Sequence, residues 1–325
     1  MKLATVVCLS LCTLGSYAEA AQDNRLPALL NEFADTVADF KNLTVKWEVR
    51  YETPKGIATR IEAIRTIYKG ANYRQELASM NGDKKVDSRS VTLLSNGKIY
   101  TLMLPQRTMS VKKASGGDLQ TQESPVFFSY LAIVNAKLPD LELKPYNFEA
   151  KSATLADFAP GGAFKAFSKV LETERDTARL SQNTSGETIE IRVNTGATIG
   201  GLPVVNALLF PLKSSDTLYP SSVNRYFISK NASGKPQEGL ADTFTIKEYQ
   251  KIKYKTDKGA KTFTVPKLSE LVFGGETPDT ETQKMVFTIE SVSINDEIDD
   301  AEFEPDLSQA DSFFDRDTGK LIKQP

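Results

Sequence analysis

Six strand-like segments, separated by short turn sequences, occupy residues 43–113 and limit the folds open to this chain. The clearest is LTVKWEVRYE, whose apolar positions are Leu43, Val45, Trp47, Val49 and Tyr51. Because successive side chains of a β-strand point to opposite faces, this pattern predicts a strand with one buried face. Six strands of about ten residues joined by short turns form an antiparallel meander, and strands this long twist. The sequence therefore predicts a strongly curved antiparallel sheet.

The fifth segment, SNGKIYTLMLPQRTMSV, departs from simple alternation. Asn96-Gly97 predicts a tight hairpin, because a type I′ turn needs positive φ at both central residues. The strand that follows, 98–104, is apolar on both sides: Ile99 and Met103 fall on one, and Tyr100, Leu102 and Leu104 on the other. Both faces therefore need an apolar partner, for which we expect a helix in the hollow of the sheet and a second apolar layer outside it.

Helices are predicted at three places. In NRLPALLNEFADTVADFK, residues 24–41, the apolar residues recur at three- and four-residue spacing, which indicates an amphipathic helix. Two more are expected in SPVFFSYLAIVNAKL, 124–138, and in GGAFKAFSKVLETER, 161–175. Strand patterns return after residue 177, ending with a hairpin around Thr318-Gly319. The predicted class is α+β: one half-open barrel domain, residues 21–325, with N-terminal and inserted helices covering the concave face and a partly helical insertion around 114–220.

The first twenty residues have the composition of an export signal. Lys2 precedes an apolar run of about a dozen residues, and Ala18-Glu19-Ala20 has the small-x-small pattern of a signal-peptidase site. We expect residues 1–20 to be a signal peptide. The mature chain would then begin near Ala21 and be periplasmic, or secreted if the source has no outer membrane. No later apolar stretch is long enough to span a bilayer, so no stable membrane insertion is expected.

Composition excludes several kinds of catalytic site. The chain has no histidine, and both cysteines, Cys8 and Cys12, lie in the predicted signal. The mature protein therefore has no thiolate, no Ser-His-Asp triad and no ordinary zinc or copper site. The formal net charge of −2 argues against a nucleic-acid partner. The acidic run NDEIDDAEFEPD, 295–306, lacks EF-hand spacing, so we interpret it as a solvated connection rather than a Ca²⁺ site, and no cofactor or metal is expected.

Several weak motifs in a fixed order resemble the periplasmic outer-membrane lipoprotein carrier (LolA-like) superfamily, in an extended bacterial form. The amphipathic helix, the first strand with its aromatic residue and NGKIYTLMLPQRTMSV carry the N-terminal part of the resemblance. FTIKEYQKI, TVPKLSELVF and FTIESVSINDEIDDAEFEPD with DRDTGK carry the C-terminal part. The resemblance covers roughly residues 26–113 and 221–320. This chain is longer than the simple carriers, by about a hundred residues between Ala114 and Pro220.

The resemblance implies a half-barrel whose apolar cavity shelters acyl chains of a lipid or lipoprotein, without catalysis. Each methylene removed from water contributes about 0.8 kcal/mol, so a chain of ~14 carbons offers on the order of 10 kcal/mol before costs. The predicted cavity lining is Val45, Trp47, Val49, Tyr51, Tyr100, Leu102, Leu104, Phe127, Phe128 and Leu131. Ordinary core packing explains any one of these residues as well, because barrel interiors are commonly filled.

Two other functions are compatible with the sequence. An exported hydrolase could work with carboxylates alone, as glycosidases do, although no pair of acidic residues can be placed at the required separation from sequence. A non-catalytic envelope sensor or interaction module could use the same half-barrel to bind envelope proteins, and would have a filled hollow with an exposed edge or patch.

Overall fold

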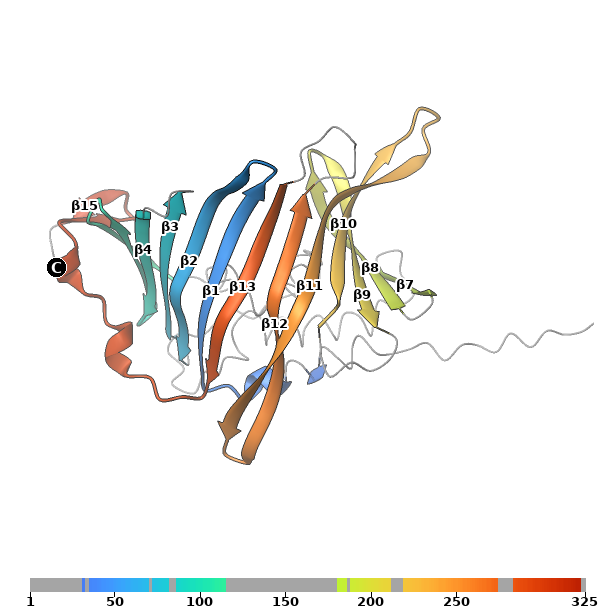
Figure 1. The fold of residues 1–325 in the computed structure, drawn as a ribbon. Helices are drawn as coiled ribbons and strands as arrows, with labels where there is room; N and C mark the ends of the chain where they lie inside the picture. Colours follow the sequence, from blue (N-terminus) through green and yellow to red (C-terminus); the bar gives the residue numbers. More distant parts are fainter. Residues whose placement is uncertain are drawn as a thin grey trace, which may run out of the picture.

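The structure, a computed structural model, describes residues 31–32, 35–69, 72–81, 86–114, 180–185, 188–211, 219–273 and 283–322. Fifteen strands in this part of the chain form one large, curved sheet (Figure 1). Their spatial order is β15-β14-β6-β5-β4-β3-β2-β1-β13-β12-β11-β10-β9-β8-β7. The strands are β1 (Asn42–Thr53), β2 (Gly56–Lys69), β3 (Asn72–Asn81), β4 (Val86–Ser95), β5 (Lys98–Leu104), β6 (Thr108–Lys113), β7 (Leu180–Ser185), β8 (Thr188–Ile199), β9 (Leu202–Pro211), β10 (Ser222–Lys230), β11 (Pro236–Thr256), β12 (Gly259–Phe273), β13 (Gln283–Ile294), β14 (Ser312–Asp315) and β15 (Lys320–Ile322).

The predicted meander is confirmed. Strands β1 to β6 pair in chain order, all antiparallel, and their bounds agree with the six predicted segments. Asn96 and Gly97 have φ values of 49° and 70°, as a type I′ turn requires. The predicted hairpin at Thr318-Gly319 is also present, as β14–β15.

The described residues are mostly β, so the α+β class is not what the structure shows. Helical residues before β1 are 31–32 and 35–38, inside the predicted first helix, and Phe40 is buried against Tyr254 and Phe263 with both ring centroids at 5.3 Å. The helices predicted at 124–138 and 161–175, and the signal at 1–20, lie outside the described residues. Helices covering the concave face are therefore not shown.

The C-terminal residues form a strap across one face of the sheet. Residues 296–315, here called the strap, leave β13 near the middle of the sheet and return to its end, where β14 pairs with β6 in parallel. Two short 3₁₀-helices lie between, η3 (Asp300–Phe303) and η4 (Leu307–Gln309), capped by the side chains of Asp299 and Asp306. The strap buries Phe303 and Phe313, each 2% exposed, against the sheet.

Cross-strand pairing divides the sheet into two faces, because residues directly opposite each other project to the same side. The Trp47 face contains the buried side chains of β1. Its members can be followed across the sheet through direct pairs: Leu43, Tyr68, Tyr73, Leu94 and Ile99 toward β5, and Val49, Phe287, Ser269 and Ile246 toward β11.

The opposite face, here called the strap face, is charged in the middle of the sheet. Ion pairs run from β2 to β11 on this side, through Arg60–Glu48, Arg50–Glu52, Lys284–Glu52, Lys284–Glu270 and Lys247–Glu270. Next to this series of ion pairs, over β2 to β6, the strap covers an apolar part of the same face. The middle of the sheet is thus apolar on one side and charged on the other, as expected where one face meets water.

Candidate functional site

The predicted cavity lining does not lie on one face. Val45, Trp47 and Val49 are buried on the Trp47 face, with exposed fractions of 0%, 7% and 5%. In β5 it is Ile99, through its pairing with Leu94, that shares this face.

Tyr100, Leu102 and Leu104 project to the strap face instead. Leu102 packs with Met109, Ala310 and Phe313, and Tyr100 and Leu104 pack around that cluster. The grouping of these three residues with Trp47 in one cavity is therefore wrong, because the pairing register from β1 to β5 places them on opposite sides of the sheet. Phe127, Phe128 and Leu131 lie outside the described residues.

Trp47 is held at a β-bulge. The pairing of β1 shifts register beside Lys46 on both sides, and the indole N–H donates to Thr66 Oγ1 at 3.2 Å. Thr66 is fully buried and also accepts from Gln75 Nε2 at 3.4 Å. Since a buried indole N–H without an acceptor is costly, the Thr66 hydroxyl fixes the ring on this face.

At one end of the Trp47 face the apolar side chains are only partly buried. Tyr51 pairs with Met285, Met285 with Leu271, and Leu271 with Phe244. Phe273, two residues beyond Leu271, packs beside Tyr51 with ring centroids 6.4 Å apart and ring planes tilted by 43°. All five keep intermediate exposure, whereas the neighbouring row of Val49, Phe287, Ser269 and Ile246 is buried. We call these five residues, Tyr51, Phe244, Leu271, Phe273 and Met285, the apolar row.

Polar groups border the apolar row. The Tyr51 hydroxyl donates to Gln283 Oε1. Asp242, which pairs with Phe273 and is 6% exposed, accepts from Arg225 Nε at 2.8 Å. Burial raises the pKa of Asp242, while the hydrogen bond and charge of Arg225 act in the opposite direction. An apolar surface with a guanidinium–carboxylate pair at its margin can accommodate an amphiphile.

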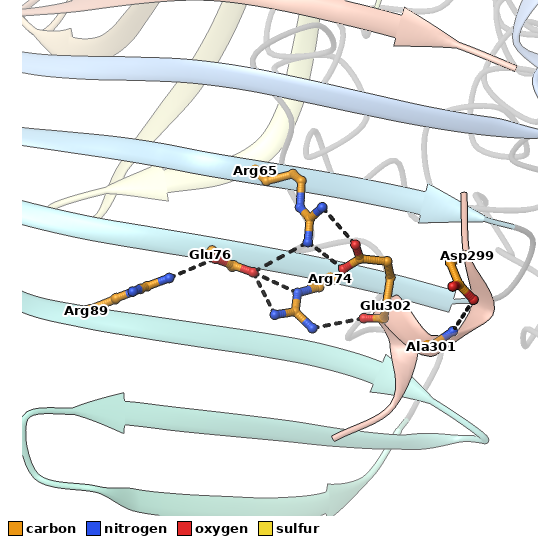
Figure 2. Close-up of polar contacts among 7 residues, drawn as sticks. All are labelled: Arg65, Arg74, Glu76, Arg89, Asp299, Ala301 and Glu302. Carbon is orange, nitrogen blue, oxygen red and sulfur yellow. Dashed lines mark hydrogen bonds and ion pairs between the residues drawn. The ribbon is translucent and has the colours of Figure 1, made fainter. Parts of the chain in front are cut away.

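The strap is fastened by a separate cluster of charges on the other face (Figure 2). Glu76, 7% exposed, accepts from Arg74 at 2.6 and 2.9 Å and from Arg89 at 3.0 Å. Arg65 binds both carboxylate oxygens of Glu302 in the strap, and Arg74 Nη1 donates to the Glu302 carbonyl at 2.9 Å. The acidic run 295–306 is therefore in part a docked element rather than a solvated connection.

The part of the chain that the structure describes shows neither a metal-binding cluster nor a membrane-spanning helix. The described residues contain no group of three His, Cys, Asp or Glu side chains placed to hold a metal ion. In the same part of the chain, no helix combines the length and the apolar character needed to cross a membrane.

Sequence reasoning missed four of the five residues of the apolar row. Phe244, Leu271, Phe273 and Met285 all lie in segments that were predicted as strands. Their proximity to Tyr51 depends on the pairing of β1 with β13, which are separated by some 230 residues along the chain. Alternation identifies the buried side of a strand but not the strand with which it pairs, so no local sequence signal marks the apolar row.

Comparison with known proteins gives only distant likenesses. No family model and no curated protein matches the chain. A DUF1329 family protein from Desulfovibrio piger is similar over 86% of this chain and 95% of its own, with 9% identity and a TM-score of 0.41. A putative outer membrane lipoprotein-sorting protein domain from Vibrio parahaemolyticus is similar over 86% and 97%, with 8% identity and a TM-score of 0.40. At TM-scores this low, the likeness carries no argument about function.

Proposed function

We propose that this chain is an exported, non-catalytic protein that binds the acyl chain of a lipid or lipoprotein at the apolar row of the Trp47 face. The observation that carries the proposal is the partial exposure of five large apolar side chains directly beside a buried stretch of the same face. Contiguous apolar side chains in contact with water mark binding sites more often than isolated ones do. An acyl chain lying along the row would remove this surface from water.

The energetics favour an acyl ligand and require no catalytic group. Burial of each methylene contributes about 0.8 kcal/mol, so ~14 carbons supply on the order of 10 kcal/mol before the cost of ordering the chain. Arg225 and Asp242 beside Phe273 give a polar margin where a headgroup can keep its hydrogen bonds. The apolar row would then take the chain and the margin the headgroup.

The proposal is tested with 11-dansylaminoundecanoic acid, a fluorescent fatty acid. Trp47 is the only tryptophan of the protein and lies on the same face, so bound probe should receive energy from it. We expect saturable transfer from Trp47 to the dansyl group, reversed by unlabelled myristic acid.

Two neighbouring residues of β12 give a matched pair of variants. Leu271→Glu places a carboxylate in the apolar row, and it should abolish binding, because burying an unpaired charge against an acyl chain is costly. Val272→Glu puts the same carboxylate on the strap face opposite Lys284, and binding should be retained. Circular dichroism shows whether each variant is folded. No transfer with folded wild-type protein, or equal loss in both folded variants, would overturn the proposal and favour the interaction-module alternative.

Export is tested independently by N-terminal sequencing of the envelope fraction. The Ala18-Glu19-Ala20 pattern predicts a mature end at or near Ala21. Recovery of the chain with Met1 intact in the cytoplasm would contradict export without bearing on acyl binding.

A further inference from the structure

The hairpin of β11 and β12 extends beyond the rest of the sheet as a two-stranded ribbon (Figure 1). Residues 249–256 pair with 259–266, whereas β12 pairs with β13 only from Leu268 onward and β11 pairs with β10 only up to Thr245. The ribbon is roughly 23 Å long at the usual rise per strand residue. One side is buried: Tyr254 and Phe263, 4% and 3% exposed, pack against Phe40.

The other side of the ribbon is lined with lysines. Lys251, Lys253 and Lys255 alternate along β11 and are exposed, with Lys258 in the turn beyond them. Alternate strand residues are about 7 Å apart, so the three lysines of β11 form a straight row. The residues opposite Lys253 and Lys255 are Thr262 and Ala260, which carry no charge.

The positive charge is concentrated here. Residues 247–267 contain seven lysines and two acids, Glu248 and Asp257, which gives +5, whereas the whole chain has a formal net charge of −2. Two other lysines of this segment are paired: Lys267, at the base of the ribbon, with Glu248 at 3.2 Å, and Lys261, nearer the turn, with Asp39. In the described part of the chain, no carboxylate lies within 4 Å of the ammonium groups of Lys253, Lys255 and Lys258, so their charge is open to an external partner.

We propose that the lysine side of this ribbon docks the protein onto an anionic phospholipid surface. Two observations favour lipid over an acidic protein. Lysine is depleted at the centres of protein interfaces, where rigid aromatic and arginine anchors dominate, and this side of the ribbon offers threonine and alanine between its lysines. Flexible ammonium groups in a row match a fluid surface of dispersed phosphates, which requires charge density and no defined geometry.

The test is cosedimentation with vesicles of phosphatidylcholine containing 30% phosphatidylglycerol, at low ionic strength. The triple variant Lys253→Gln, Lys255→Gln, Lys258→Gln should bind roughly 100-fold more weakly, at about fivefold for each lysine removed. Binding of the wild-type protein should disappear in 0.5 M salt, since exposed charges are then screened.

A matched control removes three exposed lysines from other turns of the sheet, Lys55→Gln, Lys230→Gln and Lys235→Gln, with the same change in net charge. The control should bind like the wild type, and pure phosphatidylcholine should bind none of the three proteins. Equal weakening of both triple variants would show a non-specific charge effect and overturn the proposal. Binding to polyglutamate without binding to anionic vesicles would overturn it as well, in favour of an acidic protein. Acyl binding at the apolar row is measured without vesicles, so the two proposals fail separately.

Discussion

Replacing Glu76 with glutamine would test whether the charge cluster in Figure 2 stabilises the fold. The Glu76 side chain is 9% exposed and accepts three hydrogen bonds from Arg74 and Arg89 at 2.6 to 3.0 Å, with Arg65 at 3.8 Å. Glutamine keeps the shape of the side chain and removes its charge, which leaves three guanidinium groups with no carboxylate at their centre.

The expected loss is about 3 kcal/mol in the free energy of unfolding. Removing one partner of a buried ion pair typically costs about 3–5 kcal/mol. The lower end applies because the side chains of Arg74, Arg65 and Arg89 are 21%, 32% and 46% exposed, so water takes up part of their charge. For a domain of this size the loss corresponds to a fall in Tm of roughly 6 °C.

The effect of Glu76→Gln on the free energy of unfolding should depend on pH in a defined direction. Burial would raise the pKa of Glu76, but the hydrogen bonds from Arg74 and Arg89 and the neighbouring charges outweigh it and hold the pKa below its ordinary value. The stabilisation is therefore complete above the unfolded-state pKa of about 4.3 and is lost as the pH falls through the folded-state pKa. The difference between wild type and Glu76→Gln should narrow steadily below about pH 4.

Urea unfolding followed by Trp47 fluorescence measures the difference at each pH. Glu248→Gln is the control, because the Glu248–Lys267 pair is about half exposed on both sides and should contribute less than about 0.5 kcal/mol. A Glu76→Gln protein within 0.5 kcal/mol of wild type at pH 7, or a difference that persists unchanged at low pH, would refute the electrostatic reasoning.

Three further outcomes follow from the structure. Glu302→Gln should increase amide hydrogen exchange in 300–303, because Arg65 loses its bidentate partner in the strap, and unchanged exchange would contradict that fastening. Gly239→Ala should cost about 1–3 kcal/mol, since its Cβ would come within 2.3 Å of the Phe227 ring, and Phe227→Leu in the same chain should recover part of the loss in a thermal melt. Burial raises the pKa of Tyr249 to about 12. Only the unfolded phenol ionises between pH 10 and pH 12, so the free energy of unfolding should fall by about 2–3 kcal/mol over that range. A difference titration of the wild type against Tyr249→Phe, followed by phenolate absorbance, would refute this prediction if Tyr249 ionised in the folded protein at its ordinary pKa.

The first half of the sheet could be predicted from sequence because its information is local. The strand patterns of the segments and turn residues such as Asn96-Gly97 define β1 to β6 and their order of pairing. Apolar residues on both sides of β5 also correctly predicted a second apolar layer. Its identity could not be predicted, because Phe303 and Phe313 lie in a stretch with no periodicity. The sheet residues they pack against, such as Ile67 and Leu102, lie more than 200 residues earlier in the chain.

Of the apolar row, only Tyr51 could be predicted from the sequence, together with the buried residues on its side of β1, Val45, Trp47 and Val49. Grouping Tyr100, Leu102 and Leu104 with them required the register across four strand pairs, and a shift of one residue exchanges the two faces of a strand. The structure contains such irregularities, since β1, β2, β3 and β11 all have register shifts. Alternation within one strand therefore shows which of its residues share a side. Which face of the sheet that side belongs to depends on pairings that local sequence does not encode.

The two proposed surfaces lie at opposite ends of one strand. In β12 the ribbon turn precedes Gly259, and the apolar row includes Leu271, twelve residues later and roughly 40 Å away along an extended strand. A membrane surface held at the lysines would therefore contact the sheet at a distance from the apolar row. Because ion pairing at the ribbon is screened by salt and apolar burial at the row is not, high ionic strength should release the protein from vesicles while leaving fatty-acid binding intact. Loss of both activities together in high salt would mean that the two surfaces do not act independently.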